Sequence, residues 1–137
     1  GRDVMGDIHA HLAARSSAPS LALQLLCLQG LESWLAALAK QLTPAAASNR
    51  VFAAGLRERL ESSLRWICRC WTHPCRQVNH LSPQLFQKTL ALLRSAPRSL
   101  QPPVLPLVLA LPRSHRGRYQ ALKMLLEADG PLAAGGE

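Results

Sequence analysis

Residues 68–75 hold the side chains best suited to chemistry. They read Cys-Arg-Cys-Trp-Thr-His-Pro-Cys, so three thiols and one imidazole lie close together along the chain. Such a set could bind zinc as a Cys3His site. The spacing argues against this, because Cys68 and Cys70 are two positions apart on a predicted helix and their side chains point about 200° apart. We therefore predict no metal site and ordinary helical roles for these cysteines.

The remaining histidines do not form a recognisable catalytic set. His9 and His11 lie on opposed faces of a predicted helix, and His80 and His115 have no carboxylate neighbour in sequence. No Gly-rich loop follows a strand to hold a nucleotide. A Ser–His or Cys–His pair that meets only in space stays open. We expect a protein that is not an enzyme, with no catalytic residue and no cofactor.

The positive charge is gathered in one long region. The formal net charge is +8, arginines outnumber lysines 13 to 3, and residues 62–126 contain no acid. A guanidinium pairs bidentately with phosphate or carboxylate, so the region favours a nucleic acid or an acidic protein surface. A solvated, Arg-rich helix face is the alternative. The cations of this region are Arg65, Arg69, Arg76, Lys88, Arg94, Arg98, Arg113, Arg116, Arg118 and Lys123.

Composition predicts an all-α fold. The chain has 137 residues, enough for one core, with 48% hydrophobic and 4% aromatic residues and 27 leucines. The scarcity of β-branched and aromatic residues argues against a sheet. No transmembrane helix is expected, because polar residues interrupt the most apolar stretch, 21–39. The absence of a signal peptide and the few clustered cysteines indicate a reducing, cytoplasmic setting.

Leucines at three- and four-residue spacing predict the helices of the first half of the chain. A short helix spans residues 3–14. Ser20 caps a long helix over 21–41, whose wide apolar surface indicates packing on more than one side. After a linker at 43–47, Ser48 or Asn49 caps a second long helix that ends near residue 71.

Prolines divide the second half of the chain. A third helix is predicted from the apolar stripe over residues 78–90. Pro83 is predicted to kink this helix or to split it in two, with Ser82 as the cap of the second part. Residues 104–111 predict a short buried helix. Ser114 begins the last helix. The buried side of that helix is predicted to consist of Tyr119, Leu122, Leu125 and Leu126.

Two interpretations of the three tryptophans are open. They could be stacking platforms for nucleic-acid bases, but on helices they are more often packing anchors. Trp71 lies on a leucine stripe and is predicted to be in the core, as is Trp34. Trp66 lies off the stripe and is predicted to be more exposed.

Five to seven antiparallel helices fit either a compact bundle or an α-solenoid of the armadillo or HEAT kind. The wide stripes favour the solenoid, since each helix can pack within its pair and against the next pair. We therefore predict that residues 1–137 form a single helical-repeat segment, an interior excerpt of a much larger solenoid. Residues 131–137 are predicted to be a frayed tail.

Two segments are similar to the THADA family, the thyroid adenoma-associated proteins and their fungal relatives in tRNA methylation. Residues 70–90 resemble the family's Trp-x-His-Pro, Val-x-His and Phe pattern, and residues 111–127 resemble its Gly-x-Tyr pattern downstream. Thr72, Cys75 and Arg76 depart from the family and make this face more basic. The residues that carry the resemblance are Trp71, His73, Pro74, Val78, His80, Phe86, Gly117 and Tyr119.

The resemblance implies an armadillo-type, non-catalytic partner of an FtsJ-like tRNA methyltransferase. That enzyme adds a 2′-O-methyl group to nucleotide 32 in the anticodon loop, and the scaffold positions the tRNA. The animal family member is also linked to calcium-pump regulation at the endoplasmic reticulum.

Arg113, Arg116, Arg118 and Lys123 are the predicted RNA contacts, because Arg116 and Arg118 flank a glycine near a helix start. A helical-repeat module whose basic face binds an acidic partner protein, including a calcium pump, is the alternative function.

Overall fold

The computed structural model describes residues 4–15 and 20–128, and this part is entirely helical, as predicted. Six α-helices are joined by a five-residue helix, α3, and by two 3-10 turns. The predicted tail at 131–137 lies outside the described residues. The elements are α1 (Val4–Arg15), α2 (Leu21–Leu38), η1 (Ala39–Gln41), α3 (Pro44–Ser48), α4 (Arg50–Trp71), α5 (Arg76–Arg94), η2 (Arg98–Leu100), α6 (Val104–Leu109) and α7 (Arg118–Ala128).

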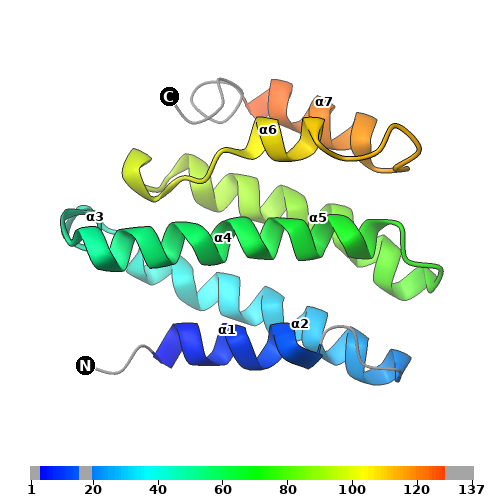
Figure 1. Cartoon of the computed structure of the whole chain (residues 1–137), viewed down its shortest axis with the longest axis horizontal. Helices are drawn as coiled ribbons and strands as arrows, with labels where there is room; N and C mark the ends of the chain where they lie inside the picture. The colour runs from blue at the N-terminus through cyan, green and yellow to red at the C-terminus, as the bar shows by residue number, and fades with distance from the viewer. Residues whose placement is uncertain (1–3, 16–19, 129–137) are drawn as a thin grey trace.

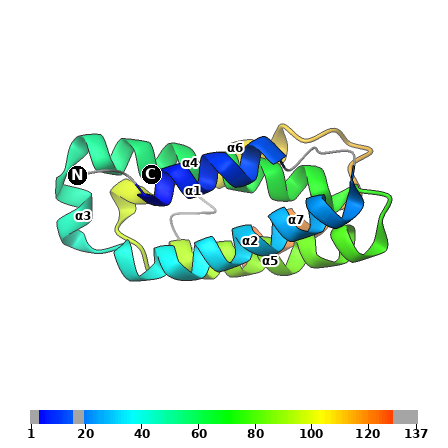
Figure 2. The same cartoon turned by 90° about the horizontal axis from the view of Figure 1, so that it is seen from below.

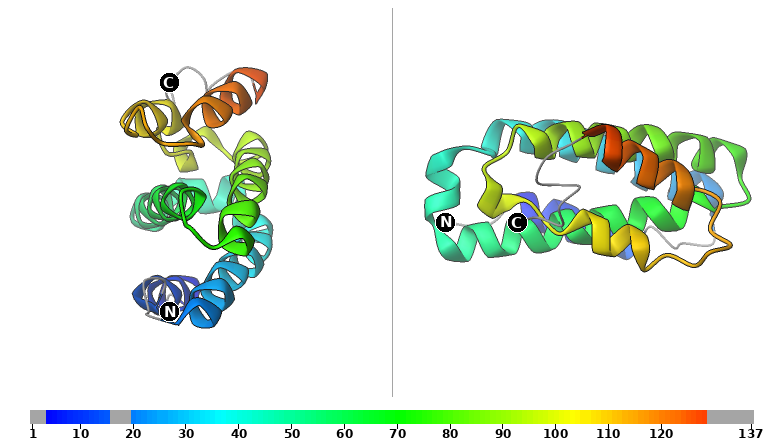
Figure 3. Two further views of the ribbon diagram at one scale, coloured as in Figure 1. Left: turned by 90° about the vertical axis from the view of Figure 1, so that its right-hand side faces the viewer. Right: turned by 90° about the horizontal axis from the view of Figure 1, so that it is seen from above.

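The helices form two layers. One layer contains α1, α4 and α6, and the other contains α2, α5 and α7, as the end-on view in Figure 3 shows. Consecutive helices run in opposite directions as pairs, α1 with α2, α4 with α5 and α6 with α7 (Figures 1 and 2). The α4–α5 pair has the most extensive contact and lies in the middle, because α5 also contacts both α2 and α7.

The predicted helix starts are confirmed at the two long helices. The Ser20 Oγ accepts from the Leu23 N–H at 3.3 Å, and the Asn49 Oδ1 accepts from the Phe52 N–H at 3.1 Å, so Asn49 and not Ser48 caps α4. Each bond satisfies one N–H that the first helical turn leaves unpaired. The predicted linker at 43–47 is wrong in part, because Pro44 begins the short helix α3, where its fixed φ suits the first turn.

The predicted apolar stripe of α4 lies at the centre of the core. Its leucines and isoleucine meet α5 on one side, and their side chains have at most 1% exposure. Burying each such side chain contributes about 1.5–3 kcal/mol. The fully covered members of this stripe are Leu56, Leu60, Leu64 and Ile67.

Helix α5 passes through Pro83 without a break, so the predicted split is wrong. Ser82 is buried and donates to the Val78 carbonyl at 2.9 Å, so it does not cap a new helix. Val78 and Phe86, on either side of the proline, are both buried. Their packing offsets the stability lost because Pro83 has no N–H to donate to the helix. Cys75 is the N-cap residue of α5, and its side chain makes no capping hydrogen bond.

The last helix begins at Arg118, four residues later than predicted, and its predicted buried side is partly wrong. Leu125 is buried and Leu122 is half-buried, but Tyr119 is 79% exposed and Leu126 is 74% exposed. Helix α7 lies at one end of the stack, so only the side that meets α5 and α6 is covered.

Helix α2 shows the same asymmetry at the other end of the stack. Leu28 and Leu31 are fully buried, and α2 contacts both α1 and α5, which confirms the predicted packing on more than one side. Leu21 and Leu26 are more than half exposed, so part of the apolar surface of α2 is left uncovered. By length and composition alone, the helical stretch Leu21–Gln41 could cross a membrane, contrary to the expectation from sequence. In this fold α2 packs on α1 and α5.

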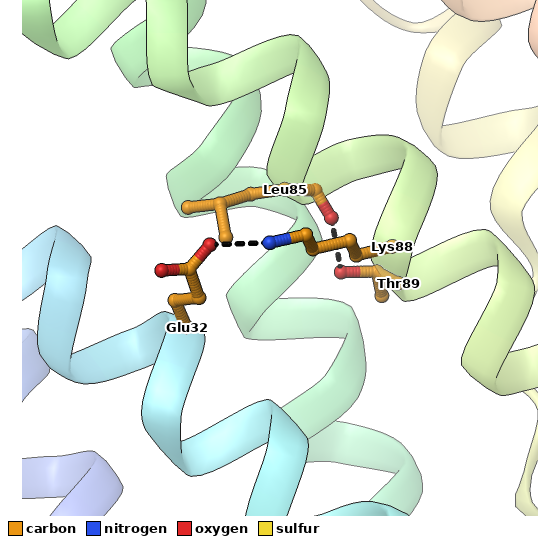
Figure 4. Close-up of polar contacts among 4 residues, drawn as sticks. All are labelled: Glu32, Leu85, Lys88 and Thr89. Atoms are coloured by element: carbon orange, nitrogen blue, oxygen red, sulfur yellow. Dashed lines mark hydrogen bonds and ion pairs between the residues drawn. The ribbon is translucent and has the colours of Figure 1, made fainter.

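An ion pair joins α2 to α5 at the surface. The Lys88 Nζ lies 2.7 Å from a carboxylate oxygen of Glu32, and Thr89 donates to the Leu85 carbonyl on the same stretch of α5 (Figure 4). Lys88 is well exposed and Glu32 is partly exposed, so the pair adds little stability. It does neutralise Lys88, which removes this lysine from the free positive charge of the chain.

A buried polar contact holds α1 on the stack. The His9 Nε2 lies 2.8 Å from the Ser63 Oγ, and Ser63 donates its own proton to the Arg59 carbonyl at 2.8 Å. The His9 Nε2 therefore carries a proton and is the donor in this pair. Trp34 lies against the ring at 4.8 Å.

The tryptophans around His9 are packing anchors. The Trp34 indole donates to the Met5 carbonyl at 2.8 Å, which joins α2 to α1. Trp66 is 3% exposed and lies 6.4 Å from the His9 ring, so its predicted exposure is wrong. The reason is that α1 covers the side of α4 that the leucine stripe leaves open.

His9 should make folding stability sensitive to acid. Burial, with a smaller effect of Arg59, lowers the pKa of His9 below 6.5. A lowered pKa means that the unfolded chain binds the proton more tightly. The contribution of neutral His9 to the free energy of unfolding is therefore complete above pH 6.5. It is lost as the pH falls from 6.5 through the pKa of His9 in the folded chain, at up to about 1.4 kcal/mol per pH unit.

Urea unfolding of the wild type and of His9→Gln between pH 7.5 and about pH 5 tests this. The glutamine amide can still donate to Ser63 but cannot titrate, so the acid-induced loss should shrink. His11→Gln, at an exposed position of the same helix, should keep the wild-type profile. An unchanged profile in His9→Gln would contradict the assignment.

Candidate functional site

Two loops meet at one end of the stack and bring the arginines together. The turn between α4 and α5 and the loop between α6 and α7 both lie at the right-hand end of Figure 1. We call this region the arginine end. Its cations are Arg69, Arg76, Arg113, Arg116 and Arg118.

His73 organises the α4–α5 turn. The Cys75 N–H donates to the His73 Nδ1 at 2.9 Å, so the Nε2 carries the proton and donates to the Gln24 Oε1 at 2.8 Å. The Asn79 side chain donates to the His73 carbonyl at 2.8 Å. His73 thus ties this turn to α2 and to α5.

His115 plays the same part in the α6–α7 loop. The Gly117 N–H donates to the His115 Nδ1 at 3.0 Å, and the Nε2 donates to the Cys68 carbonyl at 2.8 Å. Cys68 is in the last turn of α4, where carbonyls have no helical partner. The bond therefore attaches the loop to the end of α4.

Gly117 allows the loop to approach α4 closely. A Cβ built at Gly117 would lie 2.4 Å from two ring atoms of Trp71, so only glycine fits under this indole. Trp71 is 6% exposed and also lies against Phe86, with the ring centroids 5.5 Å apart. Trp71, Phe86 and Gly117, three residues of the resemblance, therefore form one packed unit.

Other residues of the resemblance lie apart from this unit. Val78 is buried in α5, but Pro74 and His80 are exposed. Tyr119, predicted to be buried, is exposed on α7. These three exposed residues have no packing role that the described contacts explain.

The cysteines are not set up for nucleophilic or metal chemistry. Burial raises the pKa of Cys68 to about 11 and also raises the pKa of Cys70, where the opposing effect of Arg69 is smaller. Both thiols therefore stay protonated at neutral pH. Among residues 4–15 and 20–128, no three His, Cys, Asp or Glu side chains are grouped so that they could hold a metal ion.

A Ser–His pair does meet in space, but it is not an activated nucleophile. In the His9–Ser63 pair the histidine donates, and Ser63 directs its proton to a backbone carbonyl. The pair is also buried, so a substrate cannot reach it. An activated serine requires the reverse polarity, with histidine as the proton acceptor.

Most of the positive charge is uncompensated. Of the ten cations in the acid-free region, Lys88 pairs with Glu32, and Arg65 pairs with Glu61 at 2.7 Å. The other eight form no ion pair with a described residue. Such side chains keep their full positive field for a ligand.

The four predicted RNA contacts are not equivalent. Arg113 is exposed, and Arg116 is exposed with one long contact, 3.5 Å, to the His73 carbonyl. Arg118 is half-buried, and its Nε is enclosed without a partner among the described residues. Lys123 is exposed farther along α7. Arg113 and Arg116 are therefore the freest to bind.

An open groove between α4 and α6, of about 540 Å³, was not predicted. One signal in the sequence was available, because its α4 side follows helical spacing from Glu61 to Thr72. The residues that line it are Glu61, Arg65, Cys68, Arg69, Thr72, Pro103, Pro106, Leu107, Ala110, Leu111, Pro112 and His115.

No protein-family model, curated protein or solved structure matches the chain. The resemblance to the THADA family therefore stays a prediction.

The close approach at Gly117 predicts opposite effects for two Gly-to-Ala changes. Gly117→Ala should destabilise the fold by about 1–3 kcal/mol, because the methyl group overlaps the Trp71 ring. Gly55→Ala in α4 should stabilise it by about 0.5–1 kcal/mol, because its Cβ meets only the end of Arg59 at 3.9 Å and alanine favours a helix. Chemical denaturation of both variants measures the difference. Equal effects would contradict the packing of Trp71 on Gly117.

Proposed function

We propose that this chain is a non-catalytic helical scaffold that binds RNA at its arginine end. Following the resemblance to the THADA family, the RNA is tRNA. The scaffold positions it in the cytoplasm for 2′-O-methylation of nucleotide 32 by an FtsJ-like methyltransferase partner.

The observation that carries this proposal is the grouping of unpaired arginines. The five guanidinium groups belong to the last turn of α4, the starts of α5 and α7, and the α6–α7 loop, which His115 and Gly117 hold against the end of α4. None of the five forms an ion pair with a described residue. Phosphates of a folded RNA offer the bidentate acceptors that such groups bind, and these contacts position an RNA without reading its bases.

A scaffold role agrees with the chemistry of the described residues. The Cys68 and Cys70 thiols are protonated, and the two histidines of the loops use both ring nitrogens in structural hydrogen bonds. The methyl transfer would therefore be the work of the partner enzyme, while the scaffold supplies binding energy and orientation.

We further propose that the two layers are part of an armadillo- or HEAT-like solenoid. Three successive antiparallel pairs stack with their first helices in one layer and their second helices in the other. The exposed leucines at the outer faces, such as Leu26 on α2 and Leu126 on α7, are suited to packing against further helical pairs.

Charge reversal at the arginine end should weaken RNA binding. Arg113→Glu with Arg116→Glu should reduce the affinity for labelled tRNA at least tenfold at low salt. It should also reduce the slope of log K against log salt by roughly 1–2, since each lost phosphate contact releases about one counterion fewer. Arg118 is kept, because its guanidinium is partly enclosed.

The matched control reverses two arginines at the opposite end of the stack. Arg94→Glu with Arg98→Glu changes the net charge equally, at the end of α5 and in η2. If both double variants weaken binding alike, the effect is one of net charge and the arginine end is not the site. Absence of tRNA binding by the folded wild type, with helicity checked by circular dichroism, would refute the RNA contact. Binding of an acidic partner protein would then be the better explanation of these unpaired arginines.

A further inference from the structure

The groove between α4 and α6 is built differently from the arginine end. Its α6 side is formed by prolines and aliphatic residues, including Pro106, Leu107 and Leu111. Its α4 side carries Arg65 and Arg69. An apolar lining with a few polar groups at its edge, at this volume, is typical of a binding site for a specific ligand.

The charges at the groove have one sign in excess. Glu61 is neutralised by Arg65, since their side chains lie 2.7 Å apart. Arg69 is exposed and forms no ion pair with a described residue. His115 has both ring nitrogens occupied, so it contributes no further donor. An occupant should therefore bring one carboxylate near Arg69 and apolar groups elsewhere.

The lining favours aliphatic side chains over nucleic-acid bases. Base binding in a groove relies on aromatic stacking platforms, and the groove contains no Phe, Tyr or Trp. Along α4 it runs from Glu61 to Thr72, which corresponds to roughly 16 Å at 1.5 Å per residue. This length accommodates about three turns of a helix.

We propose that the α4–α6 groove binds a short helical segment of a partner protein. The segment carries leucine-like side chains on one face and a carboxylate beside them. The aliphatic side chains lie between α4 and α6, and the carboxylate pairs with Arg69. Helix-in-groove recognition of this kind uses anchors at three- and four-residue spacing. The groove shares Arg69 with the arginine end, but its lining includes neither Arg113 nor Arg116.

The test uses a synthetic probe with that chemistry. A labelled peptide of sequence LEELLEELLEEL, blocked at both ends and roughly 18 Å long as a helix, is titrated with the full chain by fluorescence anisotropy. The expected result is saturable binding below about 1 mM. The peptide with every Glu replaced by Gln should bind at least fivefold more weakly, because it cannot pair with Arg69.

Two variants at neighbouring positions, the last residue of α6 and its C-cap residue, locate the binding. Ala110 is an exposed part of the groove lining, and Ala110→Trp should fill the groove and weaken peptide binding at least tenfold, or about 1.4 kcal/mol. Leu109→Trp adds the same ring at a half-exposed position of α6 that does not line the groove, and it should bind the peptide normally. Arg69→Glu should abolish the preference for Glu over Gln.

Three results would overturn the proposal: no saturable binding by the folded protein, equal binding by both peptides, or no effect of Ala110→Trp. A fourth is tighter binding of single-stranded RNA than of the peptide, lost in Ala110→Trp, which would assign the groove to RNA. Failure here leaves the tRNA result unchanged, because Arg113→Glu with Arg116→Glu alters the arginine end and leaves the groove lining intact.

Discussion

Burial of helix α4 is the constraint on which the rest of the structure depends. Its leucine stripe is covered by α5, its opposite side receives α1 through the buried His9–Ser63 pair, and its last turn holds the α6–α7 loop through the Cys68 carbonyl. The arginine end and the groove both lie along this one helix. A change that displaces α4 therefore alters core packing, the grouping of arginines and the groove together.

Much of the helical fold could be predicted because local chemistry decides it. The leucine period of α4 and the side-chain caps at Ser20 and Asn49 act within a few residues, and all three are observed. The errors arise where a distant neighbour decides. Trp66 is buried because α1 covers it, and Tyr119 is exposed because nothing described covers that side of α7. Periodicity gives the face of a helix but not which faces are covered.

The candidate site was predictable in charge and not in shape. The absence of acids between Glu61 and Glu127 can be read from the sequence, and it correctly indicates a positive region. Its concentration at one end requires two loops, 40 residues apart in sequence, to be joined by His115 and by Trp71 on Gly117. The helical spacing from Glu61 to Thr72 indicates only the α4 side of the groove, and the space between α4 and α6 depends on the packing of distant segments.

The two proposed ligands should oppose one another, because they share one field. Arg69 lies at the edge of the groove and belongs to the arginine end, so a carboxylate that pairs with it lowers the positive potential available to a phosphate nearby. Binding linkage requires the effect to be reciprocal. Saturating acidic peptide should therefore weaken tRNA binding to the wild type, and this effect should fade as salt shortens the screening length to roughly 3 Å at 1 M. In Arg69→Glu the coupling should disappear. Titration of the peptide into a preformed tRNA complex, followed by anisotropy of the labelled RNA, measures it, and a salt-independent displacement would instead mean that the two ligands overlap physically.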